Sequence, residues 1–283
     1  MRILVLGASG MLGNAVIRIL AKNDDFMVFG TLRGSQPMLQ AIAPSLRFLQ
    51  GIYVDQQDSL LKAFTESRPD VVINCVGLVK QLANADDPLE AIPINSLLPH
   101  RLASMCELVN ARLIHISTDC VFSGQRGGYR ESDQPDSKDL YGRSKFLGEV
   151  SKSNAITLRT SIIGHELNSA NGLVGWFLGQ NGTVKGFRRA IFSGLPTCEL
   201  GRVIRDEVIP RVDLHGVYHV ASEPISKYEL LNLIKQIYGK DIEIVPDDCL
   251  ILDRSLNADR FREATNYVPP DWASLISQMK AFQ

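Results

Sequence analysis

The chain has 283 residues, of which 45% are hydrophobic and 22% charged, with a formal net charge of −1. This composition excludes a disordered chain, and the near-neutral charge excludes the basic surface that collects nucleic acid or an anionic membrane. The five cysteines form no CxxC pair, the five histidines have no metal-ligand spacing, and no run approaches the roughly 20 apolar residues that cross a bilayer. We therefore expect a cytoplasmic protein with reduced thiols and no metal site.

The first half of the chain alternates the patterns of strand and helix. Continuous apolar runs at 2–6 and 71–76 are typical of strands that are buried on both faces of a parallel sheet. Helical spacing follows the first run at 11–21. The other expected elements are strands at 26–32, 46–54, 112–118 and 155–160, and helices at 58–67, at about 96–110 and from Tyr141. Strands separated by helices predict an α/β fold with a doubly wound parallel sheet, the Rossmann arrangement.

This rhythm breaks after about residue 165. Residues 165–215 are rich in Gly, Asn and Arg and show weak periodicity. Beyond them we expect a strand at 217–221, a helix at about 227–238 that opens with a capping box from Ser226 and Glu229, and a last helix at 271–281. The sequence thus predicts a Rossmann domain over 1–160 and a smaller C-terminal α/β substrate lobe over 161–283, with a return to the Rossmann sheet around 210–222.

A glycine-rich turn lies directly between the first strand and the first helix. Gly7, Gly10 and Gly13 form a GxxGxxG pattern, which lets the backbone turn tightly and approach a pyrophosphate. The helix N-terminus then offers free N–H groups and a positive dipole end to the phosphates. We predict dinucleotide binding here, against the alternative of a ligand-free turn. The expected contacts are Gly7, Ser9, Gly10, Met11 and Leu12.

The end of the second strand bears on which dinucleotide is bound. A ribose 2′-hydroxyl is usually held by an Asp or Glu there, but residues 26–54 contain no carboxylate. Arg33 stands at this point and favours the 2′-phosphate of NADP, because a guanidinium matches phosphate geometry. If Arg33 is instead an ordinary solvated arginine, NAD remains an alternative cofactor. Asp55 and Gln56 follow the third strand as candidates for the adenine edge or as turn residues.

Tyr141 and Lys145 stand at i and i+4 on a predicted helix and so share a face. An ordinary tyrosine has a pKa of about 10, and a nearby ammonium favours the phenolate and lowers that pKa. The pair therefore predicts proton transfer, and the lysine is also a candidate to hold the nicotinamide ribose. Thr118, at the end of a strand, would polarise a substrate carbonyl oxygen. The alternatives are a solvated helix face and a hydroxyl that only satisfies the backbone.

Three segments make the chain resemble the dTDP-4-dehydrorhamnose reductase family, an extended branch of the short-chain dehydrogenases. They are STDCVFSG at 117–124, YGRSK at 141–145 with Gly148-Glu149, and LRTS at 158–161. The resemblance is strongest in 1–165. It implies an NADP-preferring site and a Thr118–Tyr141–Lys145 triad. It also implies reduction of a nucleotide-linked 4-keto-6-deoxy sugar for surface polysaccharides, with Cys75, Val76 and Gly77 as small residues beside the cofactor.

The chain departs from the family pattern at two places. It has NCVG at 74–77 in place of Asn-Ala-Ala, a change that keeps small side chains beside the cofactor. Ile162 stands where rhamnose-pathway reductases often have a tryptophan, which leaves the sugar and its nucleotide (dTDP, UDP or GDP) open. Cys120 stands where a 4,6-dehydratase would have a glutamate, which disfavours dehydration. An epimerase with tightly bound NAD(P) and a non-catalytic regulatory subunit, as in some methionine adenosyltransferases, remain alternatives.

Further substrate contacts are expected outside the triad. Trp176 and Arg188 are candidates to stack a base and pair a diphosphate, with lobe packing as the alternative for the tryptophan. Arg254 is a second candidate for the diphosphate, and Asp119 lies beside Thr118. Dimers through Rossmann-face helices are common in the family, so a homodimer is one assembly that the resemblance implies.

Overall fold

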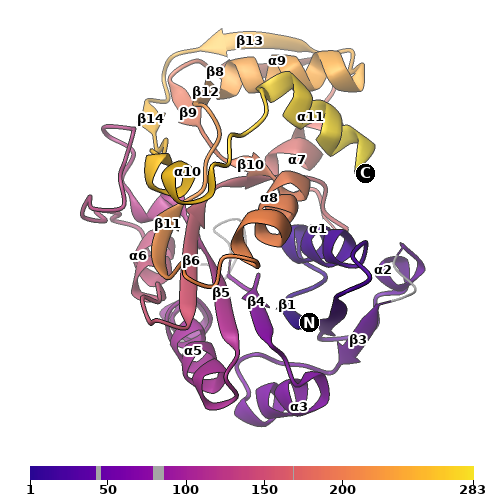
Figure 1. Cartoon of the computed structure of the whole chain (residues 1–283). Coiled ribbons are helices and arrows are strands. Elements are labelled where there is room, and N and C mark those ends of the chain that lie inside the picture. Colours follow the sequence, from indigo (N-terminus) through magenta and orange to yellow (C-terminus); the bar gives the residue numbers. More distant parts are fainter. Residues whose placement is uncertain (43–45, 79–85, 168) are drawn as a thin grey trace.

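A seven-stranded parallel sheet forms the centre of the computed structural model, which describes residues 1–42, 46–78, 86–167 and 169–283 (Figure 1). The strand order is β11-β6-β5-β4-β1-β2-β3, and every neighbouring pair is parallel. The order reverses beside β1, so the expected doubly wound α/β fold is confirmed. The strands are β1 (Arg2–Leu6), β2 (Met27–Leu32), β3 (Arg47–Gln50), β4 (Val71–Asn74), β5 (Arg112–Thr118), β6 (Ala155–Thr160) and β11 (Gly216–His219).

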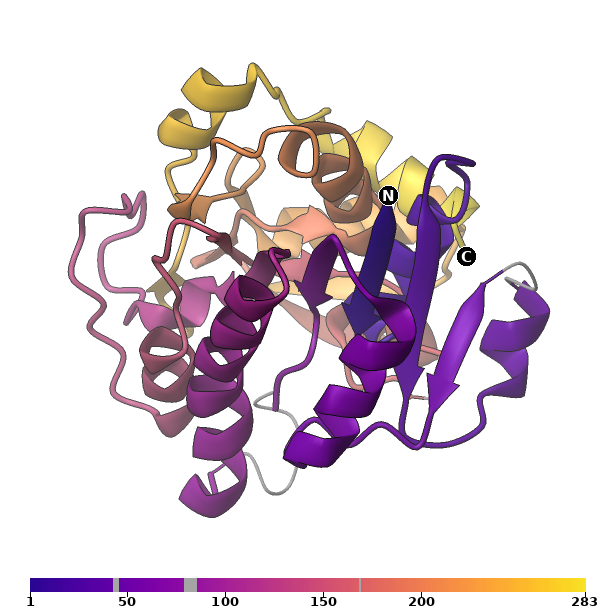
Figure 2. The same ribbon diagram turned by 60° about the horizontal axis from the view of Figure 1, so that its bottom comes forward.

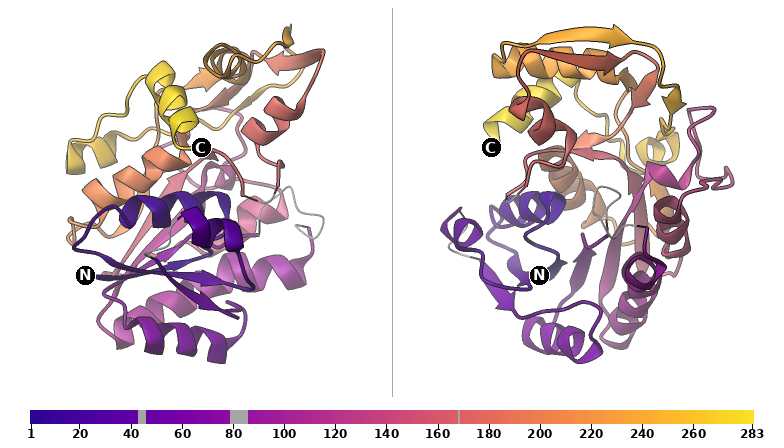
Figure 3. Two further views of the ribbon diagram at one scale, coloured as in Figure 1. Left: turned by 90° about the vertical axis from the view of Figure 1, so that its right-hand side faces the viewer. Right: turned by 180° about the vertical axis from the view of Figure 1, so that it is seen from behind.

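Helices cover both faces of this sheet, because strands buried on both sides present apolar residues in both directions. Ile3 and Val5 pack on the side of α1 (Met11–Leu20) and α8 (Thr197–Val203). Leu4 and Leu6 pack on the opposite side, which α3 (Gln57–Ser67) and α5 (Leu98–Leu108) cover. Figure 2 shows α3 and α5 in front of the sheet, and the left view of Figure 3 shows the two helical layers on either side of it.

The C-terminal lobe is built on small sheets that lie beyond the main one. A hydrophobic core, distinct from the two that flank the main sheet, packs around Phe177, Ile234 and Ile276 in this lobe. Ser226 and Glu229 form the expected capping box of α9, and that helix ends at Gly239 with a φ of +69°. The elements are β7 (Ile162–Ile163), α7 (Leu173–Gly179), β8 (Thr183–Phe187), β9 (Ala190–Phe192), β10 (Leu195–Pro196), β12 (Ile225–Ser226), α9 (Lys227–Tyr238), β13 (Glu243–Asp247), β14 (Leu252–Asp253), α10 (Asp259–Thr265) and α11 (Trp272–Ala281). Among the described residues no helix has the length and apolar character to span a membrane.

Three sequence-based expectations about the elements need correction. The strand expected over 46–54 is only β3, because Gly51 turns the chain at a φ of +71° and Ile52 then donates its N–H to the carbonyl of Leu32. The helix expected from 96 is preceded by α4 (Pro88–Ala91) and a π-helical segment, Ile92–Leu97. The stretch 165–215 is not irregular, since it contains α7, α8 and three short strands.

Candidate active site

The glycine loop joins β1 to α1 where side chains have almost no room. Gly7 has a φ of +80°, and a Cβ on Gly13 would lie 2.0 Å from the carbonyl oxygen of Gly7. Gly10 caps α1, and the amides of Met11 and Leu12 have no acceptor in the described part of the chain. These free donors and the helix dipole are what a pyrophosphate needs. The predicted contacts Gly7, Ser9, Gly10, Met11 and Leu12 all lie on this loop or in the first turn of α1.

The other predicted cofactor residues lie at the same edge of the sheet, because they follow the carboxyl ends of neighbouring parallel strands. Arg33 is exposed directly after β2 and makes no hydrogen bond or ion pair with the described residues. Asp55 and Gln56 are exposed between β3 and α3. The segment Cys75–Gly77 follows β4, and a Cβ on Gly77 would lie 3.8 Å from the Nζ of Lys145. The glycine loop and the predicted catalytic lysine therefore meet at one edge.

The predicted triad lies at the end of β5 and on α6 (Leu140–Leu147). Thr118 is the last residue of β5 and is 7% exposed. Asp139 caps α6 by accepting the N–H of Gly142 at 2.8 Å, which starts the helix immediately before Tyr141. Lys145 is 4% exposed, and its Nζ donates to the carbonyl of Ile116 at 2.7 Å. The helix thus presents Tyr141 and Lys145 toward the carboxyl end of β5.

The protonation of the pair differs from the sequence-based expectation. Burial raises the pKa of Tyr141 above its usual value, and Cys120 adds to the rise while a hydrogen bond with Thr118 opposes it. The pKa of Tyr141 is therefore raised and not lowered as the spacing alone predicts, because burial outweighs the interactions that favour the phenolate. Burial lowers the pKa of Lys145 to about 8, against the opposing charges of Glu149 and Cys75. At neutral pH the site holds a protonated phenol beside an ammonium.

Arg254, from the C-terminal lobe, reaches the end of β5. Its Nε donates to the carbonyl of Phe122 at 2.8 Å, and its Nη1 lies 3.5 Å from the Sγ of Cys120. Burial raises the pKa of Asp119, while the Arg254 charge and the Thr118 hydrogen bond oppose that rise. Three of the predicted substrate residues, Thr118, Asp119 and Arg254, are thus brought together by the fold.

Trp176 and Arg188 lie elsewhere in the lobe. Trp176 is on α7 and is 40% exposed. Arg188 lies in the turn after β8, where its guanidinium pairs with the carboxylate of Asp248. No interaction within the described residues links either side chain to the triad, so their role in substrate binding stays a prediction.

Asn95 is a residue of this site that the sequence analysis missed. It is 1% exposed and lies in the π-helical segment before α5. Its Oδ1 accepts the N–H of Leu78 at 2.9 Å, and its Nδ2 donates to the Oγ of Ser144 on α6 at 3.2 Å. Asn95 thereby ties the chain after β4 to the helix that carries Tyr141 and Lys145. The signal available in the sequence was an asparagine within a mostly apolar run, IPINSL at 92–97, and π-helical turns often occur at functional sites.

A buried ion pair lies directly behind the triad. Arg159 on β6 makes two hydrogen bonds to the carboxylate of Glu149, both at 2.7 Å, and the two side chains are 4% and 5% exposed. The hydroxyl of Ser117 donates to the same carboxylate at 2.8 Å. Arg159 also lies 3.2 Å from the Nε2 of His219 on β11. This network links β5, β6 and β11 to the chain just after α6, beneath the site.

Comparison with known protein families identifies the one to which this chain belongs. The family described as RmlD substrate binding domain matches residues 1–248. The chain belongs to this family. The sequence-based assignment to the dTDP-4-dehydrorhamnose reductase family is thereby confirmed.

Individual relatives show how far the similarity extends. The chain is 27% identical to a probable low-salt glycan biosynthesis reductase, Agl14 of Haloferax volcanii, over 92% of this chain and 85% of that protein. It is 33% identical over 150 residues to the methionine adenosyltransferase 2 subunit beta of Bos taurus, which covers 52% of this chain and 41% of that one. The dTDP-4-dehydrorhamnose reductase of Bacillus anthracis, solved in complex with NADP, aligns with a TM-score of 0.79 at 22% identity over 99% and 98% of the two chains.

Proposed function

We propose that this protein uses NADPH to reduce a nucleotide-linked 4-keto-6-deoxy sugar during synthesis of surface-polysaccharide precursors. The observation that carries the proposal is the meeting of Thr118, Tyr141 and Lys145 at the sheet edge that also holds the glycine loop. The similarity to Agl14 and to the Bacillus anthracis reductase supports the reaction class.

The residues at this edge fit a dinucleotide. The glycine loop leaves no room for a Cβ on Gly13, so the backbone can approach a pyrophosphate closely there. The first turn of α1 also has free amides. Residues 7–12 would hold the pyrophosphate, Lys145 the nicotinamide ribose and Arg33 the 2′-phosphate. When bound, NADPH supplies a hydride for the carbonyl carbon of the sugar.

The protein's own residues supply the proton and hold the carbonyl. Tyr141 keeps its proton at neutral pH because burial raises its pKa, so it acts as the acid that protonates the sugar oxygen. Thr118 would donate a hydrogen bond to that same oxygen and polarise the carbonyl. The ammonium of Lys145 stabilises the phenolate that forms on Tyr141, and burial excludes water that would weaken this interaction.

Turnover with a panel of substrates tests the proposal. The purified protein is mixed with NADPH and with dTDP-, UDP- and GDP-linked 4-keto-6-deoxy sugars, and loss of NADPH absorbance is followed. We expect turnover with at least one member of the panel, at a rate that depends on its nucleotide. NADPH that stays unconsumed with every member would overturn the proposal.

The similarity to the methionine adenosyltransferase subunit favours one second candidate, a non-catalytic subunit that binds a partner enzyme. The two candidates differ in their need for the phenol. If the protein only binds a partner, Tyr141→Phe leaves its cellular role unchanged. If it is a reductase, the same variant loses that role. Growth or polysaccharide production of cells that carry the variant separates the two.

Arg33 provides a prediction about cofactor preference. Arg33→Ala should raise the Kd for NADPH about tenfold and leave that for NADH within about twofold, because one exposed charge–phosphate contact is worth roughly 1–2 kcal/mol. Fluorescence titration with both nucleotides measures the effect. Arg101→Ala removes another exposed arginine, on α5, and should change neither Kd. Equal losses for NADPH and NADH in Arg33→Ala would contradict a 2′-phosphate contact.

The lowered pKa of Lys145 predicts a pH dependence of stability. Between about pH 8 and its usual pKa of 10.5 the unfolded chain holds a proton that the folded chain has lost. The free energy of unfolding should therefore rise with pH across this window, by up to about 3 kcal/mol relative to Lys145→Met. Urea unfolding of both proteins from pH 7 to 10.5 measures this. A constant difference between the two proteins would contradict the prediction.

A further inference from the structure

The hydroxyl group of Thr118 has structural partners as well as the proposed catalytic one, and it has a single hydrogen. Thr118 caps the short helical turn Asp119–Val121 after β5, where its Oγ1 accepts the N–H of Cys120 at 3.1 Å. The same oxygen lies 3.1 Å from the Oδ1 of Asp119, to which it donates. A hydroxyl group offers one donor and two acceptor sites. The hydrogen of Thr118 is therefore directed to Asp119 in this structure.

The proposed reduction needs that hydrogen at another acceptor, the ketone oxygen of the sugar. A hydrogen bond to an ionised acceptor is roughly twice as strong as one between neutral groups. An ionised Asp119 would thus compete with the ketone for the hydrogen of Thr118. A neutral Asp119 would not, because its own O–H group can donate to the second acceptor site of Thr118. That site is available when the phenol of Tyr141 donates to the ketone.

The surroundings of Asp119 determine which of the two forms it has. The residue is half-buried at the start of the helical turn, and burial raises the pKa of its carboxyl group. Four interactions oppose this rise, which are the charge of Arg254 and the hydrogen bonds with Thr118, Cys120 and Ser161. The fold therefore places Asp119 between one influence that favours the neutral acid and several that favour the carboxylate.

Tyr141 is the other titratable group that faces Asp119. Burial is the main cause of its raised pKa, and the charges of Cys120 and Asp119 add to the rise. The Cys120 thiol stays neutral at neutral pH, since burial raises its own pKa to about 12. An ionised Asp119 thus disfavours the phenolate that forms when Tyr141 gives up its proton. Loss of the Asp119 charge favours both the release of the Thr118 hydrogen and the proton transfer.

We propose that Asp119 is a positioning residue that controls the direction of the Thr118 hydroxyl group. As a carboxylate it holds the hydrogen of Thr118 away from the substrate, and as a neutral acid it leaves that hydrogen to the ketone. The proton that the sugar oxygen receives still comes from Tyr141. The inference rests on the proposed reduction and adds a pH dependence to it. Reduction slows as pH rises through the pKa of Asp119, which lies above its usual value of 3.8.

Carbon-13 NMR of protein labelled at the aspartate carboxyl carbons tests the hydrogen bond without turnover. The signal of Asp119 is identified by its loss in Asp119→Asn. In Thr118→Val the ionisation constant of Asp119 should fall by about threefold or more, because the carboxylate loses a donor that stabilises it. Thr118→Ser retains a hydroxyl group and should stay within about twofold of the parent protein. An unchanged ionisation constant in Thr118→Val would overturn the proposal.

Single-turnover reduction of an accepted sugar ketone between pH 4.5 and 7 tests the effect on the reaction. The rate constant of the parent protein should fall about tenfold as the pH rises, because Asp119 becomes ionised. Asp119→Asn carries an amide that donates to Thr118 at every pH, so its rate constant should change by less than about twofold. A rate constant that does not fall in the parent protein, or that falls equally in Asp119→Asn, would overturn the proposal.

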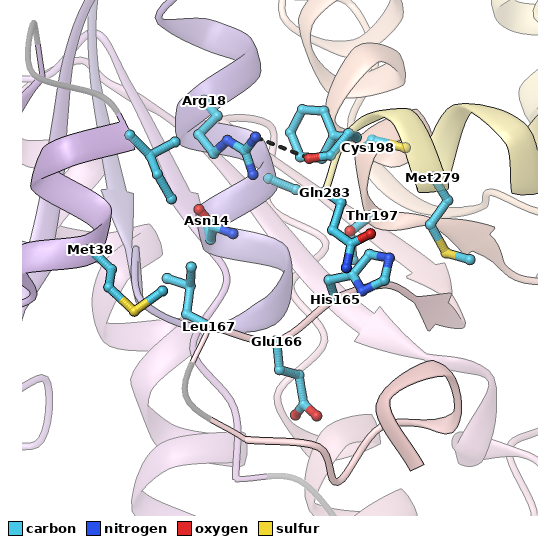
Figure 4. A pocket seen from close by; sticks show the side chains of 13 residues that line it. Asn14, Arg18, Met38, His165, Glu166, Leu167, Thr197, Cys198, Met279 and Gln283 are labelled. Carbon is cyan, nitrogen blue, oxygen red and sulfur yellow. Dashed lines mark hydrogen bonds between the residues drawn. The ribbon is translucent and has the colours of Figure 1, made fainter. Parts of the chain in front are cut away.

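Glu166 offers a matched control, because it is another half-buried carboxylate outside the triad. It lines a cavity of about 220 Å³ between α1 and α2 (Pro37–Ile42), and none of the triad residues lines this cavity (Figure 4). Its carboxylate accepts the N–H of Gly172 at 2.8 Å. Glu166→Gln should therefore keep the pH dependence of the parent protein, and loss of that dependence would overturn the assignment to Asp119. Failure of every sugar to react would count against the proposed function alone, since the NMR titration decides the hydrogen bond without turnover.

Discussion

Replacement of Tyr141 with phenylalanine should lower kcat for the nucleotide-sugar ketone by about 10²–10⁴-fold, the usual contribution of a general acid. The ring that packs beside Thr118 and Cys120 remains, and only the hydroxyl that protonates the sugar oxygen is lost. Stopped-flow single-turnover measurements with saturating NADPH report this step directly. KM should change little, because the phenol acts in the transition state more than in the ground state.

The control for this prediction separates chemistry from folding and cofactor binding. Tyr129→Phe removes the hydroxyl of another buried tyrosine, which accepts N–H groups of Gly124 and Arg126 in a loop outside the triad. It should lower stability modestly and leave kcat within a few fold. Tyr141→Phe should bind NADPH as tightly as the parent protein. Full reduction activity in Tyr141→Phe would show that another group donates the proton.

Replacement of Glu149 with glutamine should lower the free energy of unfolding by about 3–5 kcal/mol, because it leaves the Arg159 charge buried without its partner. The two side chains are 5% and 4% exposed, so water does not replace the lost carboxylate. Ser117 also loses its charged acceptor. Urea unfolding at pH 7 measures the loss.

Removal of both charges should recover most of that stability. The double variant Glu149→Gln/Arg159→Met leaves no unpaired ion, and buried pairs are often replaced by neutral groups at little cost. Glu107→Gln breaks the exposed pair with Lys152 and should cost less than about 1 kcal/mol. A double variant as unstable as Glu149→Gln alone would show that the network is needed for more than charge balance.

The local patterns of the chain were sufficient to predict most strands and helices of the Rossmann half. Buried parallel strands appear in the sequence as continuous apolar runs. The glycine pattern at 7, 10 and 13 predicts a tight turn, and a side chain does not fit at Gly7 or Gly13. The short strands of the lobe were missed, because two- to five-residue strands carry too little periodicity and are stabilised by packing. The π-helical segment with Asn95 was missed for a related reason, since its hydrogen bonds go to distant residues.

The sequence by itself determined the family, the parallel sheet and the residue types that the proposed reduction needs, because these depend on periodicity and on motifs of a few neighbouring residues. The tertiary structure decided the protonation of Tyr141 and Lys145, since burial and not their mutual spacing dominates both pKa values. It also brought Arg254 to Cys120 and joined Glu149 to Arg159, and within the described residues it left the Oδ1 of Asn14 buried without a hydrogen bond. Each of these depends on contacts between segments far apart in the chain, which local pattern does not encode.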